Sequence, residues 1–205
     1  MFRFFTGFFL AGIYPVGMKI AADYYDKGLG KSLGLLVGAL VLGTALPHLL
    51  KELTGALPWQ YVIGLTSTFA LLGGLLMFFL VPDGPFRKPS QKIDLSAFID
   101  VFKKSDFRSA AFGYFGHMWE LYTFWAFVPF MLQMYSKLNP GTILNIPLLS
   151  FSIIGIGAMA CFISGFLSQK MNTQKIARTA LALSAICCLV SPLMVLVLEI
   201  FLKEN

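Results

Sequence analysis

Long apolar segments alternate with short polar ones along the whole chain. A membrane-spanning helix needs about 20 apolar residues, and segments close to that length cover residues 2–22, 32–50, 59–81, 109–134, 146–168 and 178–202. The pattern therefore predicts an all-α, polytopic membrane protein with six transmembrane helices. The first segment is longer than the apolar core of a signal peptide and has no small-residue cleavage site after it, so we interpret it as a span.

One connection, residues 82–108, is much longer than the others. It begins with Pro82 and Pro85 and continues with mixed charges, so it is predicted to be a cytoplasmic loop. It divides the chain into two groups of three spans, at 1–81 and 109–205.

A short amphipathic helix is expected inside this loop. Asp94 is a candidate N-cap, and one helical face would collect the apolar positions Leu95, Phe98, Ile99 and Phe102. We expect this helix to lie on the cytoplasmic membrane surface. The alternative is a solvated linker, because so short a helix is marginal by itself.

Composition strengthens the membrane interpretation. Hydrophobic residues make up 57% of the chain, charged residues 13%, and the mean hydropathy is +0.75, whereas soluble domains carry about 25% charged residues. All three cysteines fall inside apolar segments, and their spacing indicates neither a disulfide nor a metal site. We expect a multi-pass protein of the cell membrane without a cofactor.

The ends of the predicted spans fall into two sets, one on each side of the membrane, and the basic residues are divided unevenly between these sets. Of the 16 Lys and Arg, all but Arg3, Lys51, Lys137 and Lys203 fall at one set. By the positive-inside rule these ends are cytoplasmic. Positive-inside placement accounts for the net charge of +6, so no nucleic-acid partner is expected. Both termini would lie outside, as expected for a piece of a longer transporter.

Three short motifs resemble those of one family, the major facilitator superfamily of twelve-span secondary transporters. Residues 3–7, RFFTG, resemble the R-x-x-x-G start of its fourth helix. Residues 165–170, GFLSQK, resemble its G-x-x-x-D-[RK] loop, with Gln169 at the acidic position and Lys170 at the basic one. Gly34, Gly43 and Pro47 resemble the fifth-helix pattern G-x8-G-x3-G-P, with Pro47 at the last glycine position.

The resemblance implies that the chain holds helices four to nine. The first three and last three helices of the transporter would be missing partners, and the lipid bilayer would surround the rest. Gly30, Gly34 and Gly38 recur every four residues, a spacing that lets two helix backbones approach closely. We therefore expect helix packing or gating at Gly34, Gly38, Gly43, Pro47, Gly165, Gln169 and Lys170.

Glu120 is an acidic residue near the centre of a predicted span, with His117 three positions earlier on the same helical face. Ionisable residues at such depth usually face a cavity and serve binding or proton transfer. One interpretation is proton coupling by Glu120 and His117. A second is solute recognition, in which Glu120 or His117 holds a polar group of the solute while Trp119, Tyr122 or Trp125 stacks on it. A third is a pair that only fixes helix packing. A metal site is not expected, because the pair supplies two ligands and no others lie at mid-span.

Two residues of the first span are further candidates. Arg3 would point toward a central cavity by the resemblance, where it could attract an anion; alternatively it lies at the lipid head groups. Tyr14 is a possible cavity residue. The sequence thus predicts a secondary active transporter of a small solute, coupled to protons and working by alternating access. The alternatives are a non-transporting truncated fragment and a membrane-embedded enzyme.

Overall fold

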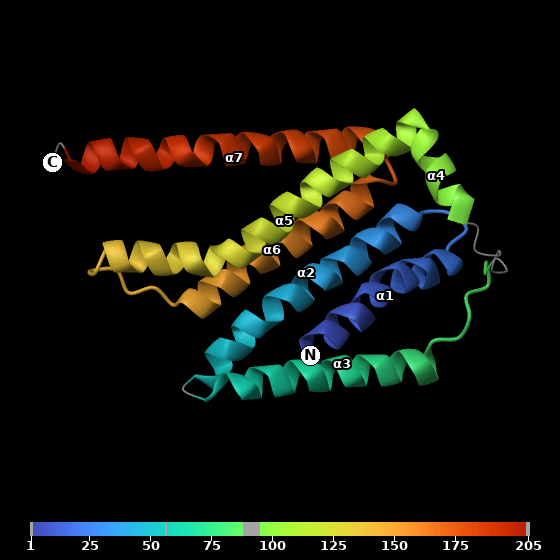
Figure 1. Cartoon of the computed structure of the whole chain (residues 1–205), viewed down its shortest axis with the longest axis horizontal. Coiled ribbons are helices and arrows are strands. Elements are labelled where there is room, and N and C mark those ends of the chain that lie inside the picture. The colour runs from blue at the N-terminus through green and yellow to red at the C-terminus, as the bar shows by residue number, and fades with distance from the viewer. Residues whose placement is uncertain (1, 56, 88–94, 204–205) are drawn as a thin grey trace.

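The described residues form a bundle of long helices with one short helix across one end (Figure 1). The computed structural model describes the backbone of residues 2–55, 57–87 and 95–203, and the side chains of 4–55, 57–87 and 99–191. Its helices are α1 (Phe2–Asp23), α2 (Leu29–Thr54), α3 (Trp59–Leu80), α4 (Leu95–Lys103), α5 (Ser105–Leu138), α6 (Ile146–Leu167) and α7 (Thr173–Lys203).

Each of the six predicted spans coincides with a long helix, and α4 coincides with the predicted loop helix. Five helices of the described chain are long and apolar enough to cross a membrane: α1, α2, α3, α6 and α7. The 34-residue α5 is long enough but less apolar. Its central turns carry His117 and Glu120, which lower the mean hydropathy. The structure thus supports an all-helical membrane protein, and the sixth span stays a prediction.

The most extensive helix contact joins α2 to α6, which run side by side in opposite directions (Figure 1). Its centre is a buried apolar cluster of Val41 and Ala45 from α2 with Ile154 and Ala158 from α6. Trp125 of α5 packs against the same cluster. The two groups of spans predicted at 1–81 and 109–205 therefore meet through this contact.

Small residues allow α2 and α6 to approach closely at one end of the contact. A Cβ atom added to Gly34 would lie 2.6 Å from the Cα atom of Gly165 and 2.9 Å from the carbonyl oxygen of Cys161. Cβ atoms added to Gly30 and Gly38 would overlap the side chains of Ser168, at the end of α6, and of Phe162. Glycine is required at position 34 because its partner is backbone, which cannot move aside as a flexible side chain can.

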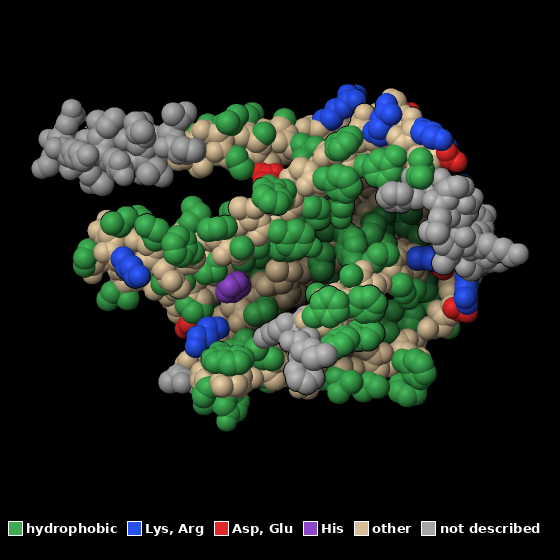
Figure 2. Space-filling view, in the orientation of Figure 1, with side chains coloured by type: hydrophobic (Ala, Val, Ile, Leu, Met, Phe, Trp, Pro, Cys, Tyr) green, Lys and Arg blue, Asp and Glu red, His purple; other side chains and the backbone are tan. Residues whose placement is uncertain are grey.

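The same end of the bundle carries most of the charged side chains (Figure 2). We call it the basic end; there α1, α3 and α6 finish and α2, α5 and α7 begin. The loop after α3 folds back onto the end of α1: Phe86 N–H donates to the Asp23 carbonyl at 2.9 Å, and the Tyr24 hydroxyl donates to the Pro82 carbonyl. Gly84 fits closely against Asp23, where a Cβ would overlap the Asp23 carbonyl.

At the opposite end, Asn145 joins two helices. Its Oδ1 accepts a hydrogen bond from Leu148 N at 3.1 Å and so caps α6. Its Nδ2 donates to Glu52 Oε1 of α2 at 2.6 Å. The α2–α6 pair is thus held at both ends, by glycine packing at the basic end and by a hydrogen bond at the other.

Candidate functional site

Glu120 is the centre of a polar contact between α5 and α7. Its Oε1 accepts hydrogen bonds from the Ser184 hydroxyl and from the Cys188 thiol, the latter at 3.2 Å. Ser184 and Cys188 are four residues apart and therefore share one face of α7. Both hydrogen bonds join a side chain of α7 to this one carboxylate of α5. The acid predicted from the sequence is thus tied to a second helix.

His117 lies on the other side of the same carboxylate. Its Nδ1 is 3.9 Å from Glu120 Oε2 and has no hydrogen-bond partner among the described residues. The His117 side chain is 43% exposed and that of Glu120 32%, so both combine protein contacts with an open side. A modest rotation of His117 would bring its ring into hydrogen-bond range of Glu120. The arrangement can hold or pass a proton between an imidazole and a carboxylate.

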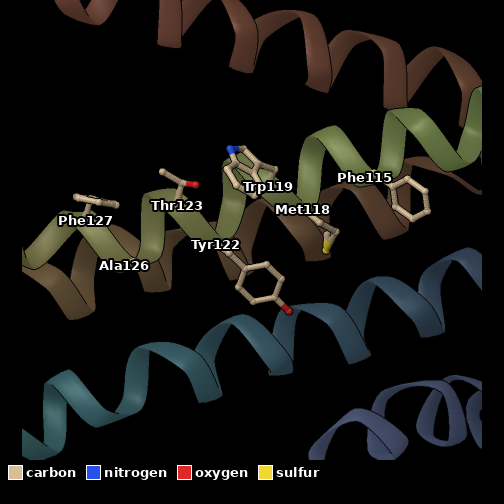
Figure 3. Close-up of a pocket in the computed structure, with 7 residues that line it drawn as sticks. All are labelled: Phe115, Met118, Trp119, Tyr122, Thr123, Ala126 and Phe127. Carbon is tan, nitrogen blue, oxygen red and sulfur yellow. The ribbon is translucent and has the colours of Figure 1, made fainter. Parts of the chain in front are cut away.

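A different face of α5 forms an open groove of about 600 Å³. All of its lining residues come from this one helix and recur every three or four positions (Figure 3): Phe115, Met118, Trp119, Tyr122, Thr123, Ala126 and Phe127. The lining is uncharged, and more than half of its residues are aromatic. The Tyr122 ring points toward α2, whereas Trp119 points away from it (Figure 3). Trp119 is 81% exposed.

The groove and the acidic pair therefore occupy separate faces of α5. Neither His117 nor Glu120 lines the groove, although Trp119 neighbours Glu120 in the sequence. With about 100° of rotation per residue, Glu120 lies about 100° and His117 about 160° around α5 from Trp119. Recognition of one solute by Trp119 or Tyr122 together with Glu120 or His117 stays a prediction. Of the predicted residues, Trp119 and Tyr122 share one site and His117 and Glu120 share another.

Tyr14 reaches the same region from α1. Its half-buried side chain interacts with that of Tyr114 on α5, and Tyr122 and Cys161 lie near by. Tyr122 also packs edge-on against Trp125, with ring centroids 5.5 Å apart. Phenol groups from α1 and α5 thus lie near one another.

The remaining predicted residues are spread over the bundle. Gly43 is exposed, with nothing near it, and Pro47 is half-buried within α2. Gln169 lies close to Gly28: its Nε2 is 3.6 Å from the position that a Cβ atom on Gly28 would take. Gly30 and Ser168 are in contact next to this pair. Lys170 is exposed. The side chain of Arg3 lies outside the described residues, as do those of Leu95, Phe98 and all of Asp94.

Sequence reasoning missed Ser184, Cys188 and Tyr114. Ser184 and Cys188 occupy a span whose other residues are mostly apolar, so their four-residue spacing was a usable signal for a polar stripe. Nothing in the sequence indicates that this stripe faces Glu120, which is 64 residues away in the chain. No group of three His, Cys, Asp or Glu in the described part of the chain is placed to bind a metal ion.

Comparison with known protein families gives one match. The sequence model of the Major Facilitator Superfamily matches residues 1–202. No curated protein and no solved structure matches the chain. The match extends over all seven helices and includes the stretches at 3–7 and 165–170 that resemble the motifs of that family. The chain belongs to the major facilitator superfamily, a family of membrane transporters.

Proposed function

We propose that the protein moves a small solute across the membrane and couples this movement to a proton carried by Glu120. The observation that supports the proposal best is the pair of hydrogen bonds from Ser184 and Cys188 of α7 to one carboxylate oxygen of α5. A carboxylate in an apolar span is costly. Its presence at a contact between two helices is explained if its charge changes during the transport cycle.

The chemistry of the contact gives a mechanism for coupling. An ionised Glu120 accepts hydrogen bonds from both Ser184 and Cys188. When Glu120 is protonated, it offers fewer acceptor sites and becomes a donor itself. Hydrogen bonds to a charged acceptor are stronger than those between neutral groups. Protonation therefore weakens the tie between α5 and α7 and permits the two helices to move apart.

His117 is the proposed proton relay. It is within 3.9 Å of Glu120 and keeps an unpaired Nδ1 on that side. A neutral imidazole can accept a proton on one nitrogen while the other donates, so it can pass protons to and from a carboxylate. In this scheme Glu120 holds the proton, and His117 sets how readily the proton is exchanged with water.

The solute is proposed to bind the groove of α5. Trp119 and Tyr122 provide flat aromatic faces, and Thr123 and Tyr122 provide hydroxyl groups. Tyr14 would approach the solute from α1 through its contact with Tyr114. Coupling between the groove and Glu120 would then pass through α5 itself, because a rotation of this helix moves both faces at once.

Alternating access is proposed to act at the α2–α6 contact. In this family the two halves of the transporter rock around a central site. Gly34 and Gly165 would form the closed gate at the basic end, and Glu52 with Asn145 the closed gate at the other. By the motif resemblance, six further helices of the same transporter complete the cavity. A chain that works without them would contradict this part of the proposal.

Uptake measurements test the function. The chain is reconstituted in proteoliposomes as part of the complete transporter that the motif resemblance implies, and it is offered a panel of radiolabelled organic anions, sugars and lipophilic cations. We expect saturable uptake of at least one class, with an increased KM in Trp119→Ala and a lost pH dependence in Glu120→Gln. Asp106→Asn is the matched control, because it removes an exposed carboxylate from the first turn of the same helix, outside the groove and the proposed gates. If Glu120→Gln keeps the pH dependence of the native chain, Glu120 is not the coupling residue.

A further inference from the structure

The short helix α4 has the features of a membrane-surface helix. It follows the described part of the loop and contacts the start of α5. In Figure 1 it runs across the direction of the long helices, at the basic end of the bundle. A helix placed across the end of a membrane-spanning bundle lies close to the level of the lipid head groups.

One side of α4 is apolar and open. Ile99 is 62% exposed. Phe102, three positions later, packs edge-on against Phe107 of α5 with ring centroids 5.2 Å apart, and Phe107 is itself 41% exposed. These side chains form a continuous apolar surface from α4 to the first turn of α5. In water such a surface is costly, and at a bilayer it is buried among acyl chains.

Basic residues border this apolar surface. Lys103 follows Ile99 by four positions and therefore shares its side of the helix, and Lys104 and Arg108 continue the basic group into α5. Lys103 Nζ is 2.7 Å from Asp100 Oδ1, but both side chains are more than half exposed. An exposed pair of this kind contributes little, so Lys103 can exchange Asp100 for another anion. Among the described residues, Lys104 and Arg108 have no recorded ion pair.

We propose that α4 and the start of α5 bind a membrane surface rich in anionic phospholipid. Ile99, Phe102 and Phe107 would enter the acyl-chain boundary, and Lys103, Lys104 and Arg108 would contact lipid phosphates. The charge is complementary: basic residues at the ends of spans face the cytoplasmic leaflet, which carries the anionic lipids. The binding anchors the loop between the two groups of spans and does not depend on the proposed role of Glu120.

Each Lys or Arg near an anionic surface strengthens attachment about fivefold, so three of them contribute on the order of a hundredfold. The effect falls with salt, because these charges are screened over roughly 10 Å at 0.1 M ionic strength. Attachment of α4 is therefore expected to be strong in anionic bilayers at low salt and weak in zwitterionic ones.

Spin-label depth measurements test the inference on the full chain. A label is placed at Ile99→Cys, and in a second protein at Asp100→Cys, in a background in which Cys161, Cys187 and Cys188 are each replaced by Ala. Both proteins are placed in nanodiscs of pure phosphatidylcholine or of phosphatidylcholine with about one third phosphatidylglycerol, a fraction chosen to resemble an anionic leaflet. Accessibility to oxygen and to a water-soluble nickel complex reports the depth of each label.

We expect the Ile99 label to be buried in the anionic nanodiscs and to become water-accessible in the zwitterionic ones, with the Asp100 label water-accessible in both. Replacing Lys103, Lys104 and Arg108 together by Gln should release the Ile99 label in anionic nanodiscs. The variant Lys103→Arg, Lys104→Arg, Arg108→Lys keeps the charge and should retain burial, which separates lipid binding from loss of folding. Equal depth in both lipids, or a water-accessible Ile99 label throughout, would overturn the proposal.

Discussion

The close approach of the α2 and α6 backbones makes a sharp prediction at Gly34. In Gly34→Ala the added Cβ would lie 2.6 Å from the Gly165 Cα atom and 2.9 Å from the Cys161 carbonyl oxygen. Carbon atoms in favourable contact are about 3.5–4.0 Å apart. The helices α2 and α6 must therefore separate by about 1 Å here, because neither neighbour is a side chain that can rotate away.

The cost of this separation follows from general packing energetics. Overpacking of a tight contact costs about 1–3 kcal/mol, while replacing glycine by alanine inside a helix returns up to about 1 kcal/mol. Gly43→Ala is the matched control, since it makes the same chemical change in the same helix with nothing within 4 Å of the new methyl group. The difference between the two variants isolates the steric term, so Gly34→Ala should be less stable than Gly43→Ala by about 1–3 kcal/mol.

Two readouts check the difference. Denaturation by SDS in mixed micelles, followed by tryptophan fluorescence, gives the free energy of unfolding of each variant. Alkylation of the half-buried Cys161, quantified by mass spectrometry of its peptide, reports separation of α2 from α6 and should be faster in Gly34→Ala. If Gly34→Ala and Gly43→Ala have the same stability and the same Cys161 reactivity, the close contact of Gly34 with Gly165 does not exist in solution.

Three further contacts make predictions of the same kind. Asn145→Ala should lower the free energy of unfolding by about 1 kcal/mol more than Asn145→Ser. Both variants lose the hydrogen bond to Glu52, but serine still caps α6. Equal losses in SDS denaturation would show that the cap is unimportant. Ser184→Ala should lower stability by about 0.5–1.5 kcal/mol and shift the pH profile of uptake, whereas Ser152→Ala, whose hydroxyl bonds only its own helix, should do neither. Gly84→Ala should loosen the loop after α3 from Asp23 and speed tryptic cleavage at Arg87, with Gly73→Ala, in open space, as the unaffected control.

Helix positions were predictable from the sequence because membrane spans carry a strong local signal. Residues 59–81 and 146–168 match α3 and α6 to within a residue at each end. The spans predicted for α5 and α7 begin about four or five residues after the helices do. Residues 105–108 and 173–177 are mostly polar, so the hydropathy pattern does not include them although they are helical. Local hydrogen bonding continues a helix into water, where hydropathy gives no signal.

The partner of each helix was not predictable. The glycines of α2 indicated a close contact with another helix. Their partner α6 lies more than 100 residues further along the chain, and no local sequence pattern encodes a contact over that separation. For the same reason, the hydrogen bonds from Ser184 and Cys188 to Glu120 could not be predicted. Trp119 and Glu120 are neighbours in the sequence, but only Trp119 lines the groove, whereas Glu120 accepts hydrogen bonds from α7.

The role of Glu120 is tested most directly by comparing two kinds of transport in the same proteoliposomes, with a solute identified by the uptake panel. Solute counterflow needs the conformational cycle but no net proton movement, whereas accumulation driven by a pH gradient needs both. The account predicts that Glu120→Gln keeps counterflow and loses accumulation driven by the pH gradient. Accumulation by Glu120→Gln at the rate and extent of the native chain would contradict it.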